Sequence, residues 1–204
     1  MSIGALQYGM LILLLATFVF LSGCISNNDA VRIDNYSTYV NQSYHTNIQY
    51  PDNWTVKEGG VQKIVTFYPP DSDPSNDTAA SFVVRLDYMG SSNGQSSLMD
   101  LYQFGIHEAY VMAPLSGRKA SISEPGNVML GGLPALTMNY TDTVDNQTVN
   151  GMIVYALKDS SWKDENGQKE CMTRYYVLEY SANAADYEKH MDDVRRMIDS
   201  FRFN

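Results

Sequence analysis

The chain has 204 residues and a formal net charge of −9 at pH 7. It contains no cluster of Lys or Arg, so the phosphate backbone of a nucleic acid would be repelled, which excludes nucleic acid as a partner. The length is sufficient for one domain around a single hydrophobic core.

The first predicted element is an apolar run, Met10–Leu21, followed by Ser22, Gly23 and Cys24. A short apolar segment that leads to small residues and a cysteine is typical of a lipobox, in which the cysteine sulfur receives a lipid after the signal peptide is removed. We therefore predict a signal peptide over residues 1–23, lipidation of Cys24, and a flexible tether over residues 24–35. The following domain would be anchored to the cell membrane and face outside the cytoplasm.

The same segment allows an alternative. No Lys or Arg precedes the apolar run, although signal peptides usually begin with a positive charge. Ile3–Ile25 is uncharged over 23 residues, and a transmembrane helix needs roughly 20. The segment is therefore either a cleaved lipoprotein signal or a retained transmembrane anchor. Both place the remaining chain outside the cytoplasm.

Cysteine usage agrees with a lipid anchor. If Cys24 carries lipid, Cys171 is the only other thiol and no intrachain disulfide can form. Cys171 falls in a strand-like run, which favours a packing role.

The chain carries six Asn-x-Ser/Thr sequons, which are typical of an exposed glycoprotein. The candidate glycosylation sites are Asn35, Asn41, Asn53, Asn76, Asn139 and Asn146.

The first half of the domain reads as antiparallel strands. Residues 44–54 form an extended stretch in which Pro51 ends the strand, and a second strand covers residues 61–68. In residues 82–88 apolar and mixed positions alternate, which predicts a strand with one covered face.

A helix then begins at Ser97, where Asp100 completes a capping-box-like start, and ends near Pro114 and Gly117. A second block of strands follows, and hairpin turns are expected at residues 145–146 and 166–167. The predicted strands are residues 119–124, 127–130, 133–141, 148–157 and 169–180. The strand at 133–141 turns Asn139 outward, because Leu136, Met138 and Tyr140 share its other face.

The last element is an amphipathic helix with Asn183 as its N-cap. Apolar residues recur at spacings of three and four, which predicts a buried stripe of Tyr187, Met191, Val194, Ile198 and Phe201. His190 falls on the polar side of this helix. Strands and helices in this order predict an α+β fold, an antiparallel β-sheet flanked by helices, over residues 36–204.

Three of these segments resemble one known family. The run Ile48–Trp54 after Tyr44, the run Gly132–Leu136 leading to Tyr140, and the final helix closing on Ile198–Phe201 are similar to the PsbP-like domain. The resemblance implies a PsbP-like α/β/α sandwich and a lipoprotein of prokaryotic, more narrowly archaeal, type. It supplies no partner-binding motif. The sequence departs from the family at His45, where Gly is usual.

Two loops contain candidate chemistry. Gly90–Gly94 matches the Gly-x-Ser-x-Gly nucleophile elbow, with Ser92 as nucleophile and His190 as a potential base. The helix starts too late for an elbow and parallel βα repeats are lacking, so a Gly/Ser loop is the preferred interpretation. Asp71–Asp77 offers alternating oxygen ligands for Ca²⁺, but Asn76 stands where an EF-hand loop needs Gly and Phe82 where it needs Glu.

The remaining polar residues indicate no catalytic or metal centre. His45, His107 and His190 are isolated in sequence, so surface or packing roles are expected. Trp54 is predicted to pack in the core and Trp162 to be partly exposed.

The sequence therefore predicts no enzyme and no cofactor. The leading hypothesis is a non-enzymatic, membrane-tethered domain that binds or stabilises a protein or glycan partner in the cell envelope. The alternatives are a small hydrolase with a site in the loop Gly90–Ser97 and a Ca²⁺-steadied adhesion module built on the Asp71 loop.

Overall fold

The computed structural model describes residues 35–204 except 61, 77, 88–96, 145 and 164–168. The predicted signal peptide, Cys24, most of the tether and Ser92 lie outside the described residues. Residues 35–204 form one compact unit.

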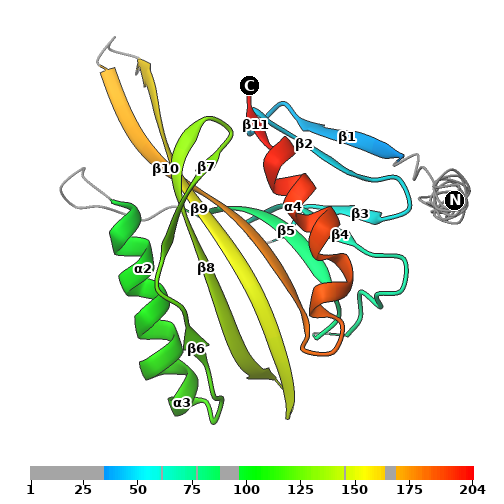
Figure 1. Ribbon diagram of the computed structural model, residues 1–204. Coiled ribbons are helices and arrows are strands. Elements are labelled where there is room, and N and C mark those ends of the chain that lie inside the picture. Colours follow the sequence, from blue (N-terminus) through cyan, green and yellow to red (C-terminus); the bar gives the residue numbers. More distant parts are fainter. Residues whose placement is uncertain (1–34, 61, 77, 88–96, 145, 164–168) are drawn as a thin grey trace, which may run out of the picture. The chain divides into compact units, whose positions relative to one another are not determined.

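An eight-stranded antiparallel sheet forms the centre of the domain (Figure 1). Its strands are β3 (Thr55–Glu58), β4 (Lys63–Tyr68), β5 (Ser81–Asp87), β10 (Lys169–Asn183), β9 (Gln147–Lys163), β8 (Leu133–Val144) and β6 (Ser121–Ile122), in spatial order, while β7 (Gly126–Leu130) also pairs with β8. The register places Tyr140 opposite Gly151 and Thr141 opposite Asn150.

A second, three-stranded sheet lies against one face of the large one. It consists of β1 (Tyr36–Asn41), β2 (Thr46–Pro51) and β11 (Arg202–Phe203), with β2 in the middle. The 3₁₀ turn η2 (Tyr187–His190) and helix α4 (Met191–Ser200) complete this layer. Their apolar side chains form the main core with the large sheet, and the largest fully buried members include Phe67, Phe82, Tyr180 and Phe201.

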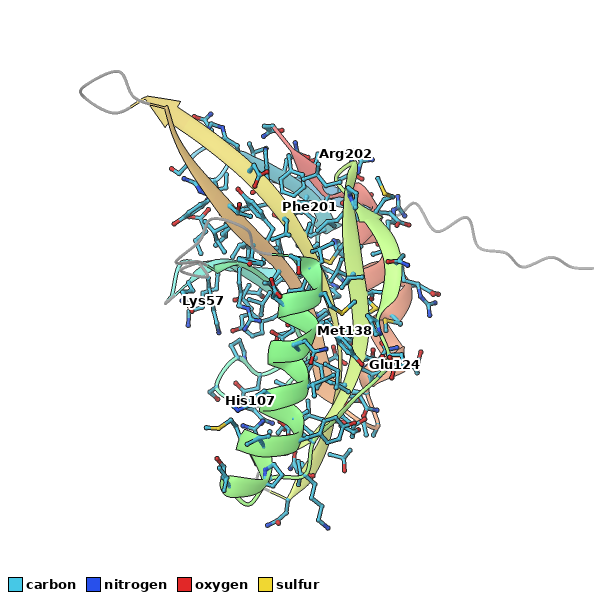
Figure 2. All side chains as sticks on the ribbon, turned by 90° about the vertical axis from the view of Figure 1, so that its left-hand side faces the viewer. Lys57, His107, Glu124, Met138, Phe201 and Arg202 are labelled. Atoms are coloured by element: carbon cyan, nitrogen blue, oxygen red, sulfur yellow. The ribbon has the colours of Figure 1, made fainter. Side chains whose placement is uncertain are left out.

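The opposite face of the large sheet carries helix α2 (Leu98–His107), which continues through a π-helical turn, η1 (Glu108–Met112), into α3 (Ala113–Leu115). Figure 2 views this face, with His107 on the helix and Met138 on β8. The core here is smaller and joins Tyr102 of α2 to Leu136, Met138, Tyr155, Tyr175 and Val177 of the sheet. The large sheet therefore lies between two unequal layers.

The predicted fold class, an antiparallel sheet flanked by helices, is confirmed. Ser97 and Asp100 cap α2 as predicted, because the Ser97 amide donates to Asp100 Oδ2 at 2.7 Å and the Asp100 amide donates to Ser97 Oγ at 3.3 Å. The predicted outward position of Asn139 is also confirmed, since its side chain is exposed.

Two predictions about the last helix are wrong. Asn183 is the final residue of β10, and its Oδ1 accepts from the amides of Ala185 and Asp186, both at 3.1 Å, so it caps a turn before the helix. His190 is buried, because the first turn is a 3₁₀ helix with about three residues per turn, which rotates His190 off the α-helical polar face.

The prediction for Trp54 is confirmed, since this residue is buried in the main core. His45 occupies the left-handed region with φ 50°. Only Gly adopts this conformation without steric cost, so the structure explains why Gly suits this position.

Candidate functional site

The predicted Asp71 loop is held by the protein's own hydrogen bonds. Asp73 Oδ1 accepts from the Ser75 amide at 2.9 Å and from Ser75 Oγ at 2.7 Å, and the backbone bond is the larger cause of the lowered Asp73 pKa. Asn76 Oδ1 accepts from the amide and hydroxyl of Thr78, both at 3.0 Å. Within the described part of the chain, no cluster of three or more His, Cys, Asp or Glu is placed to hold a metal ion.

Asp71 joins this loop to the start of the last helix. Its carboxylate forms an ion pair with Lys189 and lies 3.1 Å from His190 Nε2. The hydrogen bond from Lys189 lowers the Asp71 pKa. The His190 ring meets Trp54 edge to face at 5.7 Å. Because His190 is engaged with Asp71 and the core, this arrangement serves to dock the helix.

A polar network lies on the α2 face of the large sheet. The Tyr140 hydroxyl donates to Glu179 Oε1 at 2.8 Å, and Arg85 forms an ion pair with Glu179 Oε2 at 3.2 Å. Burial, followed by the charge of Glu179, raises the Tyr140 pKa, so its hydroxyl remains a donor.

This network forms one wall of a cavity of about 310 Å³ beneath α2. Gly105 and Ala109 leave space on the helix side, and Ile122, Ile153 and Tyr155 supply apolar contacts. The cavity lies between the helix and the sheet, and the acidic and basic groups in its wall pair with each other.

The opposite face carries a larger opening, which we call the polar cleft. It has a volume of about 420 Å³ and lies where η2 and α4 meet strands β8 and β9. It is lined by Asn139, Tyr140, Thr141, Asn150, Gly151, Met152, Tyr187, Glu188, Met191 and Arg195. The lining of the cleft thus combines amide, hydroxyl, carboxylate and guanidinium groups with two methionines.

A third feature is an exposed apolar surface at the C-terminal end of the long helix, the α2–α3 surface. It comprises Tyr110, Val111, Met112 and Leu115, and Leu115 is 78% exposed. Arg118 and Lys119, both exposed, follow directly. Because apolar side chains gathered at an exposed site mark interaction surfaces, this end of the helix is a candidate docking site.

Among the residues that the structure describes, the predicted sites do not converge on a catalytic centre. His45 lies in the β1–β2 turn, His107 on α2 and His190 at the end of η2. The sequon residues Asn35, Asn53, Asn76, Asn139 and Asn146 are exposed, and Asn41 is partly exposed. Among them, Asn139 lines the polar cleft. The side chains of Cys171 and Trp162 lie outside the described part of the structure.

Sequence reasoning missed the polar cleft and the α2–α3 surface. The helix was predicted from its capping box and its end signals, and the exposure of Tyr110, Val111 and Leu115 was not predicted. The sequence does contain a sign of this exposed surface. Tyr110, Val111 and Met112 are adjacent large apolar residues shortly before Pro114, and one face of an α-helix cannot bury three adjacent side chains together.

No family model matches this sequence, and no curated protein matches it either. No helix in the described ranges is both long and apolar enough to cross a membrane.

Solved structures share the fold. Cyanobacterial PsbP (CyanoP) from Synechocystis sp. PCC 6803 is 14% identical with a TM-score of 0.55, and the match covers 89% of this chain and 100% of that one. LpqN of Mycobacterium tuberculosis, a protein involved in cell envelope biogenesis, is 12% identical with a TM-score of 0.57, over 85% of this chain and 87% of that one. These matches confirm the PsbP-like fold predicted from the sequence.

Proposed function

We propose that this protein is a membrane-tethered, extracytoplasmic binding domain without enzymatic activity, and that it docks an envelope protein on its α2–α3 surface. Residues 1–23 direct export, Cys24 carries the lipid, and residues 24–35 link it to the domain at residues 36–204. The envelope role of LpqN, a protein of similar fold, supports this setting.

The observation that carries the proposal is the exposure of Tyr110, Val111, Met112 and Leu115 at one end of the helix. The exposure of large apolar side chains to water is unfavourable. A bound partner that buries them gains a free energy of about 25 cal/mol per Å² of apolar surface. The neighbouring Lys119 adds a positive charge at this end, whereas Arg118 is paired with Asp142. A partner with an apolar groove and an acidic group beside it, facing Lys119, would complement this surface.

The position of the surface favours a protein over the lipid bilayer as the occupant. The tether joins the domain at β1, which packs with β2 and α4 against one face of the large sheet. Helix α2 packs against the other face (Figure 1). The attachment point of the tether and the α2–α3 surface therefore lie on opposite faces of the large sheet.

Site-specific photo-cross-linking in native membranes tests this proposal. A photoreactive residue placed at Leu115 is expected to yield a discrete protein adduct, which Val111→Glu in the same chain abolishes. Both side chains are exposed, so folding is preserved. The matched control is Met129 on β7, which is 63% exposed and lies away from α2–α3.

The same experiment distinguishes the alternatives. Adducts to phospholipid at Leu115, or equal adducts at Leu115 and Met129, would contradict a protein partner at this surface. Mass spectrometry of the protein extracted from membranes measures the anchor directly, since a lipid on Cys24 in a chain starting at that residue is the expected product. An intact N-terminal segment would identify a retained anchor instead.

A further inference from the structure

The polar cleft lies on the face of the sheet opposite α2 and is separate from the proposed docking surface. Two walls form it. The strand wall contributes Asn139 and Thr141 from β8 and Asn150 from β9, and the helix wall contributes Glu188 and Arg195. The β8–β9 register keeps the strand wall together by pairing Thr141 with Asn150, and Thr141 Oγ1 lies 3.1 Å from Asn150 Oδ1.

The chemistry of the walls suits a saccharide. Amide and hydroxyl side chains donate and accept hydrogen bonds, as sugar hydroxyls do, and the carboxylate of Glu188 and guanidinium of Arg195 add a strong acceptor and a strong donor. Met152 and Met191 line the same cleft, where their thioethers can contact the apolar C–H faces of sugar rings. Because Glu188 and Arg195 carry opposite charges, the helix wall does not favour an anionic ligand.

One wall residue is itself a candidate attachment point for a sugar. Asn139, Tyr140 and Thr141 form a sequon, and both Asn139 and Thr141 are exposed. Adjacent residues of a strand point to opposite faces, so Asn139 and Thr141 lie on the cleft face while Tyr140 extends its hydroxyl to Glu179 on the other. The other sequon residues are absent from the cleft lining.

We propose that Asn139 carries an N-linked glycan and that the polar cleft seats the first sugars of that glycan. Attachment at the cleft wall makes binding intramolecular, with an effective concentration in the millimolar range for so short a link. A cleft with a dissociation constant on the order of 0.1 mM for the sugar would therefore be mostly occupied. The glycan would then shield the edge between β8, β9 and α4.

The first test is glycopeptide mass spectrometry on the full protein isolated from its native membranes. We expect a saccharide on Asn139, lost in Asn139→Gln and in Thr141→Val and retained in Thr141→Ser. Asn139→Gln keeps the Thr141 hydroxyl and Thr141→Val keeps Asn139, so the two variants remove the glycan by independent routes. An unmodified Asn139 in the wild-type protein overturns the proposal.

The second test asks whether the sugar lies in the cleft. Hydrogen exchange of residues 149–152 and 187–191 is expected to be several-fold faster in both glycan-free variants, and faster in Arg195→Ala, which keeps the glycan but lacks a wall residue. The matched control, Asn53→Gln, removes an exposed sequon in the β2–β3 turn and should leave this exchange unchanged. Equal exchange in all variants would show a glycan pointing into solvent and would overturn the proposal. Neither result depends on the docking of a partner at α2–α3.

Discussion

Gly151 lies directly beneath the Tyr140 ring, so Gly151→Ala should be severely destabilising. A Cβ atom at this position would lie 2.2 Å from Tyr140 Cε1 and Cζ and 2.6 Å from its hydroxyl oxygen. Non-bonded carbon atoms are most favourable at about 3.5 to 4.0 Å. The ring must therefore move, which breaks the hydrogen bond from Tyr140 to Glu179.

The magnitude follows from two contributions. Forcing the Tyr140 ring out of its position to admit an added methyl group costs about 1 to 3 kcal/mol. Losing a hydrogen bond to a charged group costs about 1.5 to 3 kcal/mol. We therefore expect Gly151→Ala to lower the free energy of unfolding by about 2.5 to 6 kcal/mol.

A double-mutant cycle with Tyr140→Ala separates this mechanism from a general intolerance of Gly151. Once the ring is removed, Gly151→Ala should be neutral or stabilising by up to about 1 kcal/mol, because Gly weakens a strand. Urea unfolding of the four proteins should give a coupling energy above about 2 kcal/mol. An equal cost of Gly151→Ala in both backgrounds would show that the Tyr140 ring is not the cause of the destabilisation.

Two further predictions concern turns and charge. His45→Gly should raise the unfolding free energy by up to about 1 kcal/mol in urea titrations, since it relieves the left-handed conformation of His45, and a loss of stability would contradict this account. Asp71→Asn should lower stability at pH 7 by about 1 kcal/mol or less, because the pair with Lys189 is largely exposed. The Asp71 pKa is lowered in the folded state, so its contribution is fully present above its ordinary pKa of 3.8 and is lost as the pH falls from there through the lowered pKa. Unfolding at pH 7 and pH 3 should show this difference shrink, and a difference of unchanged size at pH 3 would argue against the ion pair.

The sequence predicts those elements whose pattern is local. Alternating apolar residues identify β5 and the central part of β8, and spacings of three and four identify α4, because each pattern reflects one covered face. β1 escaped prediction because Tyr36–Asn41 is largely polar and lies at the edge of the small sheet. Tertiary pairing with β2, rather than its own composition, makes this segment a strand.

The candidate sites depend on tertiary packing, which cannot be read from the local pattern of residues along the sequence. The polar cleft joins Asn139, Asn150 and Arg195, which become neighbours only through the β8–β9 register and the seating of α4. The burial of His190 depends on one 3₁₀ turn, which changes the direction of a side chain that α-helical spacing places in solvent. Sequence reasoning supplied Asn139 as a candidate residue, but not its surroundings.

The small sheet also constrains when the domain can form. β2 pairs with β1 at the beginning of the domain and with β11 at residues 202–203. Phe201 is fully buried, and Phe203 packs against both Phe201 and Tyr176. The core therefore remains open until these residues have been synthesised, and contacts between such distant segments form slowly. In the export that we propose, the domain closes only once β11 has crossed the membrane.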